Sequence, residues 1–293
     1  MSAPNIELTL TPKDTFIFKD LSGPYFNPNW HFHPEYQISY ILEGRGTRFV
    51  GDHVETFEEG DLVFVGPNLP HLWRSEERYF DSTNNLKTRA LVIYFDHELF
   101  SLALLDKVEF HNVRKLVDHS NQGIEFSGRT RSVASELLYE IGLKEGFERI
   151  IALYEIINEL ANSTEFNLLS SPGYQNSFKG NDAENMRLVY NYVMKNFTKV
   201  ISSKEIAEQL NMTTTSFCRY FKPRANKNFT RFVNEIRIGH ARKLLIEDNL
   251  NIAQIGYHCG FNTLSNFNRQ FKMIANMSPN EYKRLFIKIR STE

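Results

Sequence analysis

Cysteine is scarce in this chain of 293 residues, which contains only Cys218 and Cys259. Two cysteines are too few for a disulfide framework, and the paired spacing that binds zinc is missing. The sequence therefore excludes small disulfide-stapled folds and zinc-ribbon folds. We expect both thiols to pack as ordinary side chains.

Long apolar runs are also missing. No stretch approaches the roughly 18 consecutive apolar residues that a membrane-spanning helix requires. The first residues, MSAPNIELTLTPKDTF, lack the basic segment and apolar run of a secretion signal. These absences predict a cytoplasmic protein that does not contact a membrane.

The chain has almost no net charge, but its two halves differ strongly. Residues 1–179 hold 16 Lys and Arg against 26 Asp and Glu, whereas residues 180–293 hold 18 against 9. A basic surface attracts phosphate backbones, and an acidic one is repelled by them. The charge distribution therefore predicts that the carboxyl-terminal half binds nucleic acid.

The length suits two domains, each large enough to bury its own core. The segment NSTEFNLLSSPGYQNSFKGND, after an apolar helical pattern that ends near Leu160, is rich in Ser, Asn, Gly and Pro. Such a composition is typical of a linker. We therefore predict a sensing domain with its following helices at residues 1–162, a linker at 163–182 and a DNA-binding domain at 183–293.

The carboxyl-terminal half carries one local pattern twice. The first copy is IAEQLNMTTTSFCRYFK (residues 206–222), and the second is IGYHCGFNTLSNFNRQFK (residues 255–272). Each has a small residue on a short first helix, a polar turn and a second helix with aromatics at helical spacing. This pattern predicts two helix-turn-helix units in one chain, which suits two major grooves.

The second helix of each unit has a polar face opposite its aromatic residues. Arginine can bind guanine bidentately, asparagine can bind adenine, and lysine can bind phosphates. We predict DNA contacts from the polar residues of both faces: Thr215, Ser216, Cys218, Arg219 and Lys222 in the first unit, and Ser265, Asn266, Asn268, Arg269 and Lys272 in the second.

Local signals define the shape of these units. The second turn is one residue longer than the first, and Gly260 stands where a left-handed backbone is needed. Pro223 is expected to end the first recognition helix early. Between the units a helical pattern of about 17 residues predicts a spacer of ~26 Å. That is somewhat less than the ~34 Å pitch of DNA. If the recognition helices are offset from the two ends of the spacer, they can still meet successive major grooves.

The segment NIAQIGYHCGFNTLSNFNRQFKMIANMSPNEYKR (residues 251–284) is similar to the signature of the AraC/XylS family of bacterial transcription regulators. The resemblance extends over residues 183–293. It implies binding to double-stranded promoter DNA and contact with RNA polymerase. The family usually has glycine after each recognition helix, where this chain has Asn226 and Asn276, residues that also tolerate a left-handed backbone.

The amino-terminal half shows many short strand patterns separated by Gly-containing turns, which predicts a sandwich or barrel. Within them lie His31-x-His33, Gln37 and, after a Gly-rich turn, Pro70-His71. This arrangement is similar to the two cupin motifs. The predicted fold class is α+β, a cupin-like β-barrel followed by helices and then an all-α domain. The expected strands are residues 15–18, 36–42, 47–50, 54–57, 61–65 and 90–95.

In the cupin family two His, a Glu and a third His hold a metal inside the barrel. Here Gln37 replaces the Glu, and a neutral amide is a weak ligand, although three imidazoles can bind zinc or iron. We therefore predict no metal and no other cofactor. Instead His31, His33, Gln37 and His71 are expected to line an effector pocket. Simple hydrogen bonding within the barrel wall is the alternative.

Two tryptophans and two helices complete the amino-terminal half. Trp30 and Trp73 lie next to the histidines in the sequence, which suits stacking on a sugar or a planar ligand, whereas alternation along a strand directs them away from the histidines into the outer layer. Residues 129–160 form an amphipathic helical pattern whose apolar face needs a partner surface. It either covers the barrel or pairs with a second subunit. The resemblance adds that this region commonly dimerises, so we predict a homodimer.

The sequence thus predicts a one-component transcription regulator and no enzyme. Its effector is a small molecule, such as a sugar or a related metabolite, and the unlike outward faces of the two units predict an asymmetric DNA site. Two alternatives remain: a metal-dependent cupin enzyme fused to a DNA-binding module, and a constitutive DNA-binding protein whose barrel is only a dimer scaffold. The effector, the operator, and the choice between activation and repression stay open.

Overall fold

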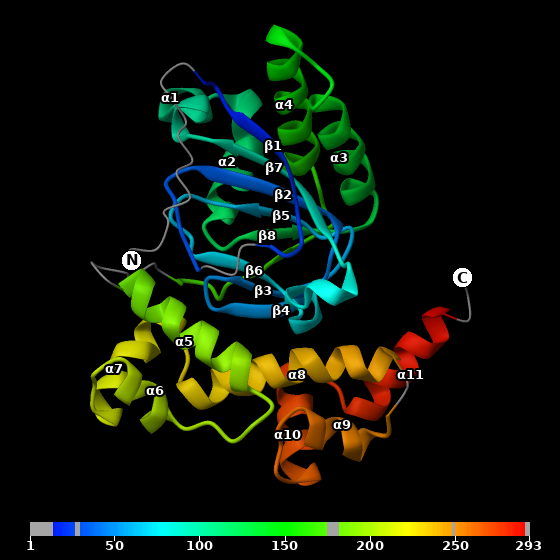
Figure 1. Cartoon of the computed structure of the whole chain (residues 1–293). Helices are drawn as coiled ribbons and strands as arrows, with labels where there is room; N and C mark the ends of the chain where they lie inside the picture. Colours follow the sequence, from blue (N-terminus) through cyan, green and yellow to red (C-terminus); the bar gives the residue numbers. More distant parts are fainter. Residues whose placement is uncertain (1–13, 27–29, 175–181, 248–249, 291–293) are drawn as a thin grey trace. The chain divides into compact units, whose positions relative to one another are not determined.

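The computed structural model describes residues 14–26, 30–174, 182–247 and 250–290. The chain divides into two compact units, one spanning most of residues 1–176 and the other most of residues 177–293 (Figure 1). The first unit is rich in strands and the second is helical, which confirms the predicted α+β class. None of the described helices is both long enough and apolar enough to cross a bilayer.

Two antiparallel sheets form the first unit. Their facing sides share one apolar cluster that includes Ile41, Val63, Trp73 and Val92. The larger sheet has the strand order β1 (Ile17–Gly23), β7 (Thr88–Phe95), β2 (Tyr36–Glu43), β5 (Leu62–Val65), β8 (Ile124–Phe126) and β9 (Phe166–Leu168). The smaller sheet has the order β4 (His53–Phe57), β3 (Gly46–Val50) and β6 (His71–Ser75).

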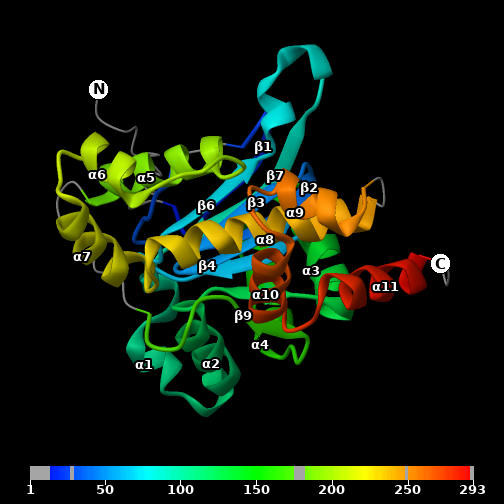
Figure 2. The ribbon, with the colours of Figure 1, turned by 90° about the horizontal axis from the view of Figure 1, so that it is seen from below.

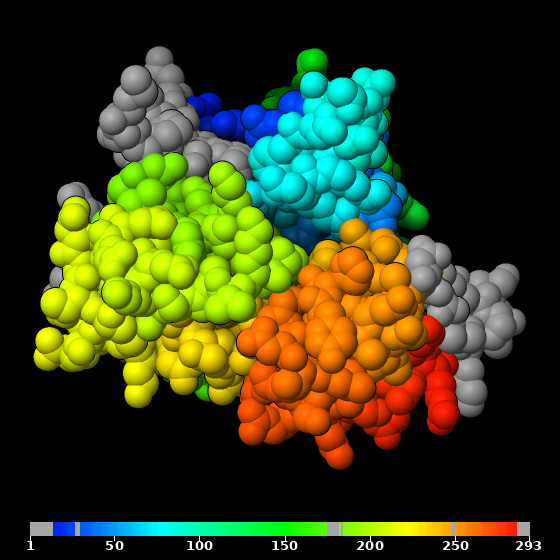
Figure 3. All heavy atoms as spheres, turned by 60° about the horizontal axis from the view of Figure 1, so that its bottom comes forward, coloured from blue at the N-terminus to red at the C-terminus, as the bar shows by residue number. Residues whose placement is uncertain are grey.

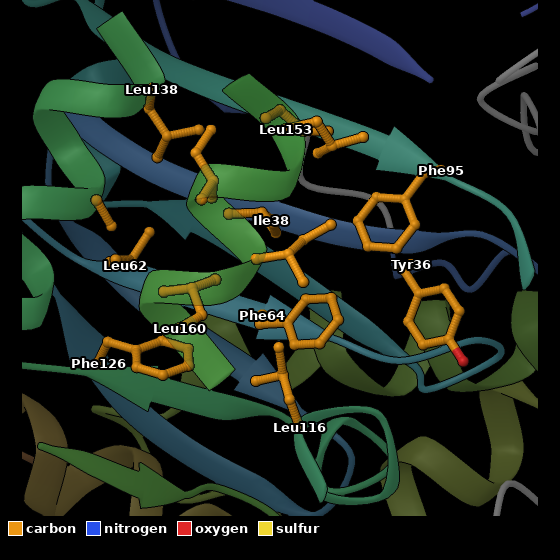
Figure 4. Close-up of a cluster of buried hydrophobic side chains, with 14 of the residues drawn as sticks. Tyr36, Ile38, Leu62, Phe64, Phe95, Leu116, Phe126, Leu138, Leu153 and Leu160 are labelled. Carbon is orange, nitrogen blue, oxygen red and sulfur yellow. The ribbon is translucent and has the colours of Figure 1, made fainter. Parts of the chain in front are cut away.

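Helices cover the outer side of the six-stranded sheet. Because side chains alternate along a strand, Ile38 and Phe64 point outward while their neighbours point into the barrel. They pack with Leu138 of α3 (Gly128–Ile141) and Leu153 of α4 (Gly146–Ala161), as Figure 4 shows. One apolar face of the predicted helix pair therefore covers the barrel. The short α1 (Leu102–Leu105) and the longer α2 (His111–Ser120) precede it.

The linker predicted at residues 163–182 is wrong in its first half. Strand β9 lies inside this range and pairs with β8. Ser170, after β9, is buried, and its hydroxyl donates a 2.8 Å hydrogen bond to the carbonyl of Gln122. A Ser- and Asn-rich composition does not prevent a short edge strand whose hydrogen bonds come from a distant partner. Residues 175–181 lie outside the described part of the chain.

The second unit contains two helix-turn-helix units joined by a long helix (Figures 1 and 2). Phe217 and Phe221 pack against Phe229 and Phe232 at one end, and Phe267 and Phe271 pack with Phe261 and Tyr282 at the other. The helices are α5 (Asp182–Asn196), α6 (Ser203–Gln209), α7 (Thr214–Ala225), α8 (Phe229–Glu247), α9 (Ile252–His258), α10 (Leu264–Ala275) and α11 (Pro279–Arg290).

The local signals of the repeat are largely confirmed. Four residues separate α6 from α7 and five separate α9 from α10, and Gly260 has a φ of 82° in the longer turn. A Cβ at Gly260 would lie 2.6 Å from the carbonyl oxygen of Phe197, so close packing as well as the backbone requires glycine. Asn226 and Asn276 end α7 and α10 with φ of 50° and 57°.

The predicted early end of the first recognition helix is wrong. Helix α7 continues through Pro223 to Ala225 and has 12 residues, as α10 does. Proline removes one donor, but Phe221 and Ala225 on either side of it are buried in the core and keep the last turn helical. The two recognition helices therefore present equally long faces.

Candidate nucleic-acid interface and ligand-binding barrel

The recognition helices α7 and α10 are built in the same way. Each starts with a threonine cap, Thr213 or Thr263, whose side chain accepts a hydrogen bond from the backbone amide three residues on. A buried stripe then recurs every fourth residue: Phe217, Phe221 and Ala225 in α7, and Phe267, Phe271 and Ala275 in α10. The stripe fixes which face of each helix points to solvent.

Most of the predicted DNA contacts lie on these solvent faces (Figure 3, α7 in yellow and α10 in orange). Two of them, Ser216 and Asn266, are only half exposed, because they lie in the capped first turn of each helix. The exposed ones are Thr215, Cys218, Arg219 and Lys222 on α7, and Ser265, Asn268, Arg269 and Lys272 on α10. Two further exposed polar residues were not among the predicted contacts: Thr214 at the start of α7 and Asn262 in the turn before α10.

The histidine cluster of the barrel also comes together. His31 and His71 exchange backbone hydrogen bonds of 2.9 and 3.3 Å, and their rings lie 4.5 Å apart between centroids. The ring of His33 lies 5.0 Å from that of His71. One ligand atom from each of the three rings falls within 4.8 Å of the others, so the set is close enough to surround one small group.

Comparison with known proteins gives matches in both units. A family model described as a helix-turn-helix domain matches residues 206–285, and one described as a cupin domain matches residues 23–78. The matched ranges contain both recognition helices and all four predicted pocket residues. The chain therefore carries an AraC-type helix-turn-helix domain and a cupin domain, and its relatives are helix-turn-helix-type transcription regulators.

Three curated relatives match over most of their length. An uncharacterised helix-turn-helix-type transcriptional regulator, YdeC of Bacillus subtilis, is 24% identical over 96% of this chain and 93% of its own. The transcriptional activator RhaS of Escherichia coli O157:H7 (strain EC4115 / EHEC) is 25% identical over 86% of each chain. The melibiose operon regulatory protein of Escherichia coli K12 is 19% identical over 93% of this chain and 89% of its own.

The two helix-turn-helix units differ in how they hold their arginines. Arg269 donates a 3.1 Å hydrogen bond from Nη2 to Oδ1 of Asn266, which orients its guanidinium. In the first unit Ser216 occupies the matching position, and its hydroxyl accepts a 2.9 Å hydrogen bond from Thr213. Among the described residues no side chain holds Arg219 in the same way. The two units therefore offer unlike surfaces.

Backbone carbonyls set the tautomers of the buried histidines in the cupin domain. Nδ1 of His33 lies 3.1 Å from the carbonyl oxygen of Glu35, and Nδ1 of His71 lies 2.7 Å from that of Leu69. Each Nδ1 therefore carries the proton, and each Nε2 offers a lone pair. Both Nε2 atoms lie 3.1 Å from the side-chain amide of Gln37. The oxygen and nitrogen of a glutamine amide have the same shape, so the hydrogen bonds decide which of them faces the rings. Because both Nε2 atoms are acceptors, the NH₂ group of Gln37 faces them and donates to both.

Burial keeps these imidazoles neutral. It lowers the pKa of His33 below the ordinary 6.5. It lowers the pKa of His71 further, and charge on His31 or His33 would add to the effect. A metal-binding histidine needs a free nitrogen lone pair and an outer hydrogen bond on its other nitrogen. His33 and His71 have the outer hydrogen bond on Nδ1, but Gln37 engages the lone pair of each Nε2, so the imidazoles would fit a divalent transition metal only with Gln37 turned away.

A charged network that the sequence did not reveal lies elsewhere in the barrel. Arg48 is fully buried on β3, donates to Asp61 and places Nη2 3.1 Å from Oε1 of Glu125. Nε1 of Trp73 donates a 3.2 Å hydrogen bond to Asp61. The only sign of this network in the sequence was Arg48 itself, the one charged residue of the strand GTRFV. Two carboxylates and one guanidinium make this part of the interior polar.

The expected outer placement of the tryptophans is wrong. Trp73 follows His71 by two residues on β6, so both side chains point to the same side of the sheet, and their rings are 5.8 Å apart. Trp30 is also buried and packs edge-on against Phe49. Trp73 is therefore part of the barrel interior.

Proposed function

We propose that this protein is an effector-controlled transcription regulator that binds an asymmetric promoter site as α7 and α10 enter successive major grooves. The observation that supports the proposal best is the matched placement of Arg219 and Arg269 on two equally long helices with buried aromatic stripes. Helix α8, of 19 residues, joins the units. At 1.5 Å per residue it is about 28 Å long, close to one turn of the DNA helix.

Selection of binding sites from random duplexes by the full-length protein tests this proposal. We expect an enriched site with two unlike elements one helical turn apart, and an affinity that falls steeply as salt is raised. A scrambled duplex of the same composition is the control. Equal affinity for selected and scrambled duplexes would rule out sequence-specific recognition.

The effector is proposed to bind inside the cupin domain, where His31, His33, Gln37 and His71 offer hydrogen bonds. The neutral imidazoles and the amide suit hydroxyl groups, and Trp73 adds an aromatic face. The similarity to the melibiose operon regulatory protein supports a sugar or a related metabolite. An effector acts only by favouring one of two arrangements with different affinity for DNA. Titration with a sugar panel, read as a change in promoter affinity, tests this step.

A homodimer is proposed through the side of α3 and α4 that does not cover the barrel. This surface exposes large apolar side chains on the two helices and on the turn between them: Tyr139, Leu143, Phe147, Ile151 and Tyr154. A second copy presenting the same stripe would bury it.

We also propose a division of labour in which described residues 14–174 sense the effector and residues 182–290 bind DNA. Promoter-bound protein is proposed to contact RNA polymerase.

The alternative function is a metal-dependent cupin enzyme fused to a DNA-binding module. It is favoured by one observation, the three convergent imidazoles. Metal analysis of the purified protein separates the two functions. Stoichiometric metal that is lost in His31→Ala and His33→Ala variants would favour the enzyme. Intact promoter binding by metal-free protein would support a regulator without catalytic residues.

A further inference from the structure

A second pocket lies outside the barrel, where α2 passes the end of α4 and the strands β8 and β9. Its volume is about 370 Å³, and small-molecule sites typically span about 300–1,000 Å³. Figure 4 shows three of its lining side chains, Leu116, Phe126 and Leu160, at one end of the apolar cluster. Ile124 and Phe166 complete an apolar floor. The pocket is therefore suited to an apolar ligand body.

The rim of this pocket is polar, and its charge has one sign. The only ionisable side chains in the lining are Lys115 and His119, both on α2. Lys115 is exposed and makes no ion pair with any described residue. Asn112 donates a 2.8 Å hydrogen bond to Asn162 and joins α2 to the end of α4. An exposed lysine at a rim without a lining carboxylate attracts an anion.

The acidic residues nearest in sequence do not line the pocket. Asp118 instead lies close enough to Tyr36 to act on its hydroxyl. Burial is the main cause of the raised pKa of Tyr36, and the negative charge of Asp118 raises this pKa further. Glu165 accepts a 3.0 Å hydrogen bond from the backbone amide of Thr130 at the start of α3. An anionic group that enters beside Lys115 therefore meets no lining carboxylate that would repel it.

We propose that this pocket binds a small monocarboxylate with an apolar body. The body packs on Leu116, Phe126 and Leu160, while the carboxylate pairs with Lys115 and accepts hydrogen bonds from the rim amides. This site is separate from the histidine cluster, which lies inside the barrel. The protein would then respond to a second ligand besides the effector of the barrel interior.

The pocket also touches the last segment of the first unit before α5. Phe166 belongs to β9, and Ser163 and Thr164 directly precede it. Strand β9 has only three residues and forms the edge of the sheet, paired to β8 through Ile124 and Leu168. A ligand held between Ile124 and Phe166 contacts both strands and stabilises their pairing. Ligand binding would therefore stabilise β9, the last strand before the DNA-binding unit.

Calorimetric titration of the full-length protein tests the proposed ligand class. The probes are phenylacetate, hexanoate and octanoate, each compared with its primary amide. We expect at least one acid to bind saturably and its amide to bind at least tenfold more weakly. Lys115→Gln should weaken binding of that acid at least tenfold and leave the amide unchanged. Arg114→Gln, which removes the adjacent exposed charge on α2, is the matched control and should bind as the unchanged protein does.

A second variant tests the location. Ala161 ends α4 in the pocket lining, so Ala161→Trp should fill the cavity and abolish acid binding while selected-site DNA binding persists. Hydrogen exchange at the amides of β9 should slow when the acid binds to the unchanged protein. The proposal is overturned if no acid binds, if acids and amides bind equally, or if Lys115→Gln and Ala161→Trp keep full affinity.

Discussion

At the scale of single residues, the exposed side chains of α7 and α10 divide into groups that suit base edges and groups that suit phosphates. Arg269 is oriented by Asn266 and has the planar fork that a guanine edge requires. Lys272 lies one turn beyond Asn268 on the same exposed face and carries a point charge. A point charge gives affinity without distinguishing between bases.

Replacement of Lys272 by alanine should therefore weaken DNA binding evenly across sequences. We expect the slope of log affinity against log salt to fall by about one, because one fewer counterion is released. Fluorescence anisotropy at several salt concentrations measures the slope. Lys204→Ala, at an exposed position on α6 of the first helix-turn-helix unit, is the control and should leave the slope unchanged. Equal slopes for Lys272→Ala and the unchanged protein would remove Lys272 from the interface.

The buried histidines predict how stability depends on pH. Burial lowers the pKa of His33 and His71 in the folded protein, whereas the unfolded chain has the ordinary value of 6.5. The unfolded state therefore binds more protons below about pH 6.5. The free energy of unfolding should fall as pH drops below this value and level off above it.

Urea unfolding at pH 5.5 and pH 7.5 measures this dependence. In His71→Gln the difference between the two pH values should shrink, because the most strongly perturbed group is gone. His97→Gln, at an exposed position, is the control and should keep the full difference. A His71→Gln variant with an unchanged pH dependence would show that His71 is protonated equally in both states.

At the scale of elements, the turns between helices were predictable because their requirements are local. The Gly260 turn, the asparagines that end both recognition helices, and the threonine caps depend on nearby residues. Strands β8 and β9 were missed because three residues carry too little pattern and pair with distant partners. The Pro223 prediction failed for a similar reason, since tertiary packing outweighed a local preference.

Gly260→Ala should destabilise the second helix-turn-helix unit. The added Cβ meets the carbonyl oxygen of Phe197 at 2.6 Å and also forces a left-handed alanine. We expect a loss of about 1–3 kcal/mol in the free energy of unfolding. Asn211→Gly, at the equivalent turn of the first unit where φ is 54°, should be neutral or stabilising. Equal unfolding midpoints for both variants in urea would contradict the assigned backbone requirement.

At the scale of the whole molecule, a strand-rich unit followed by a helical unit was predictable from the sequence, but the interior of the barrel was not. The convergence of His31, His33, Gln37 and His71 was predictable from the cupin motifs. The Arg48 network was not, because its members come from strands that are distant in the sequence. The exposed side of α3 and α4 carries large apolar side chains among its charged residues, and these apolar side chains are the basis of the proposed homodimer.

Phe147→Ser should shift the protein toward the monomer. Phe147 is 73% exposed on α4, and its loss removes apolar area from the proposed dimer surface. Sedimentation velocity over a range of concentrations measures the association. Val108→Ser, which removes a side chain that is 87% exposed away from α3 and α4, is the control. A dimer that dissociates equally in both variants, or in neither, would place the interface elsewhere.

The central claim is that one chain reads two grooves with two unlike units. The most direct measurement is the affinity of the unchanged protein, Arg219→Ala and Arg269→Ala for a set of duplexes in which each base pair of the selected site is replaced in turn. Each variant should lose about 1–3 kcal/mol of preference at its own base pair, and the two positions should lie about 10 base pairs apart. Loss at the same position in both variants, or at none, would contradict the account.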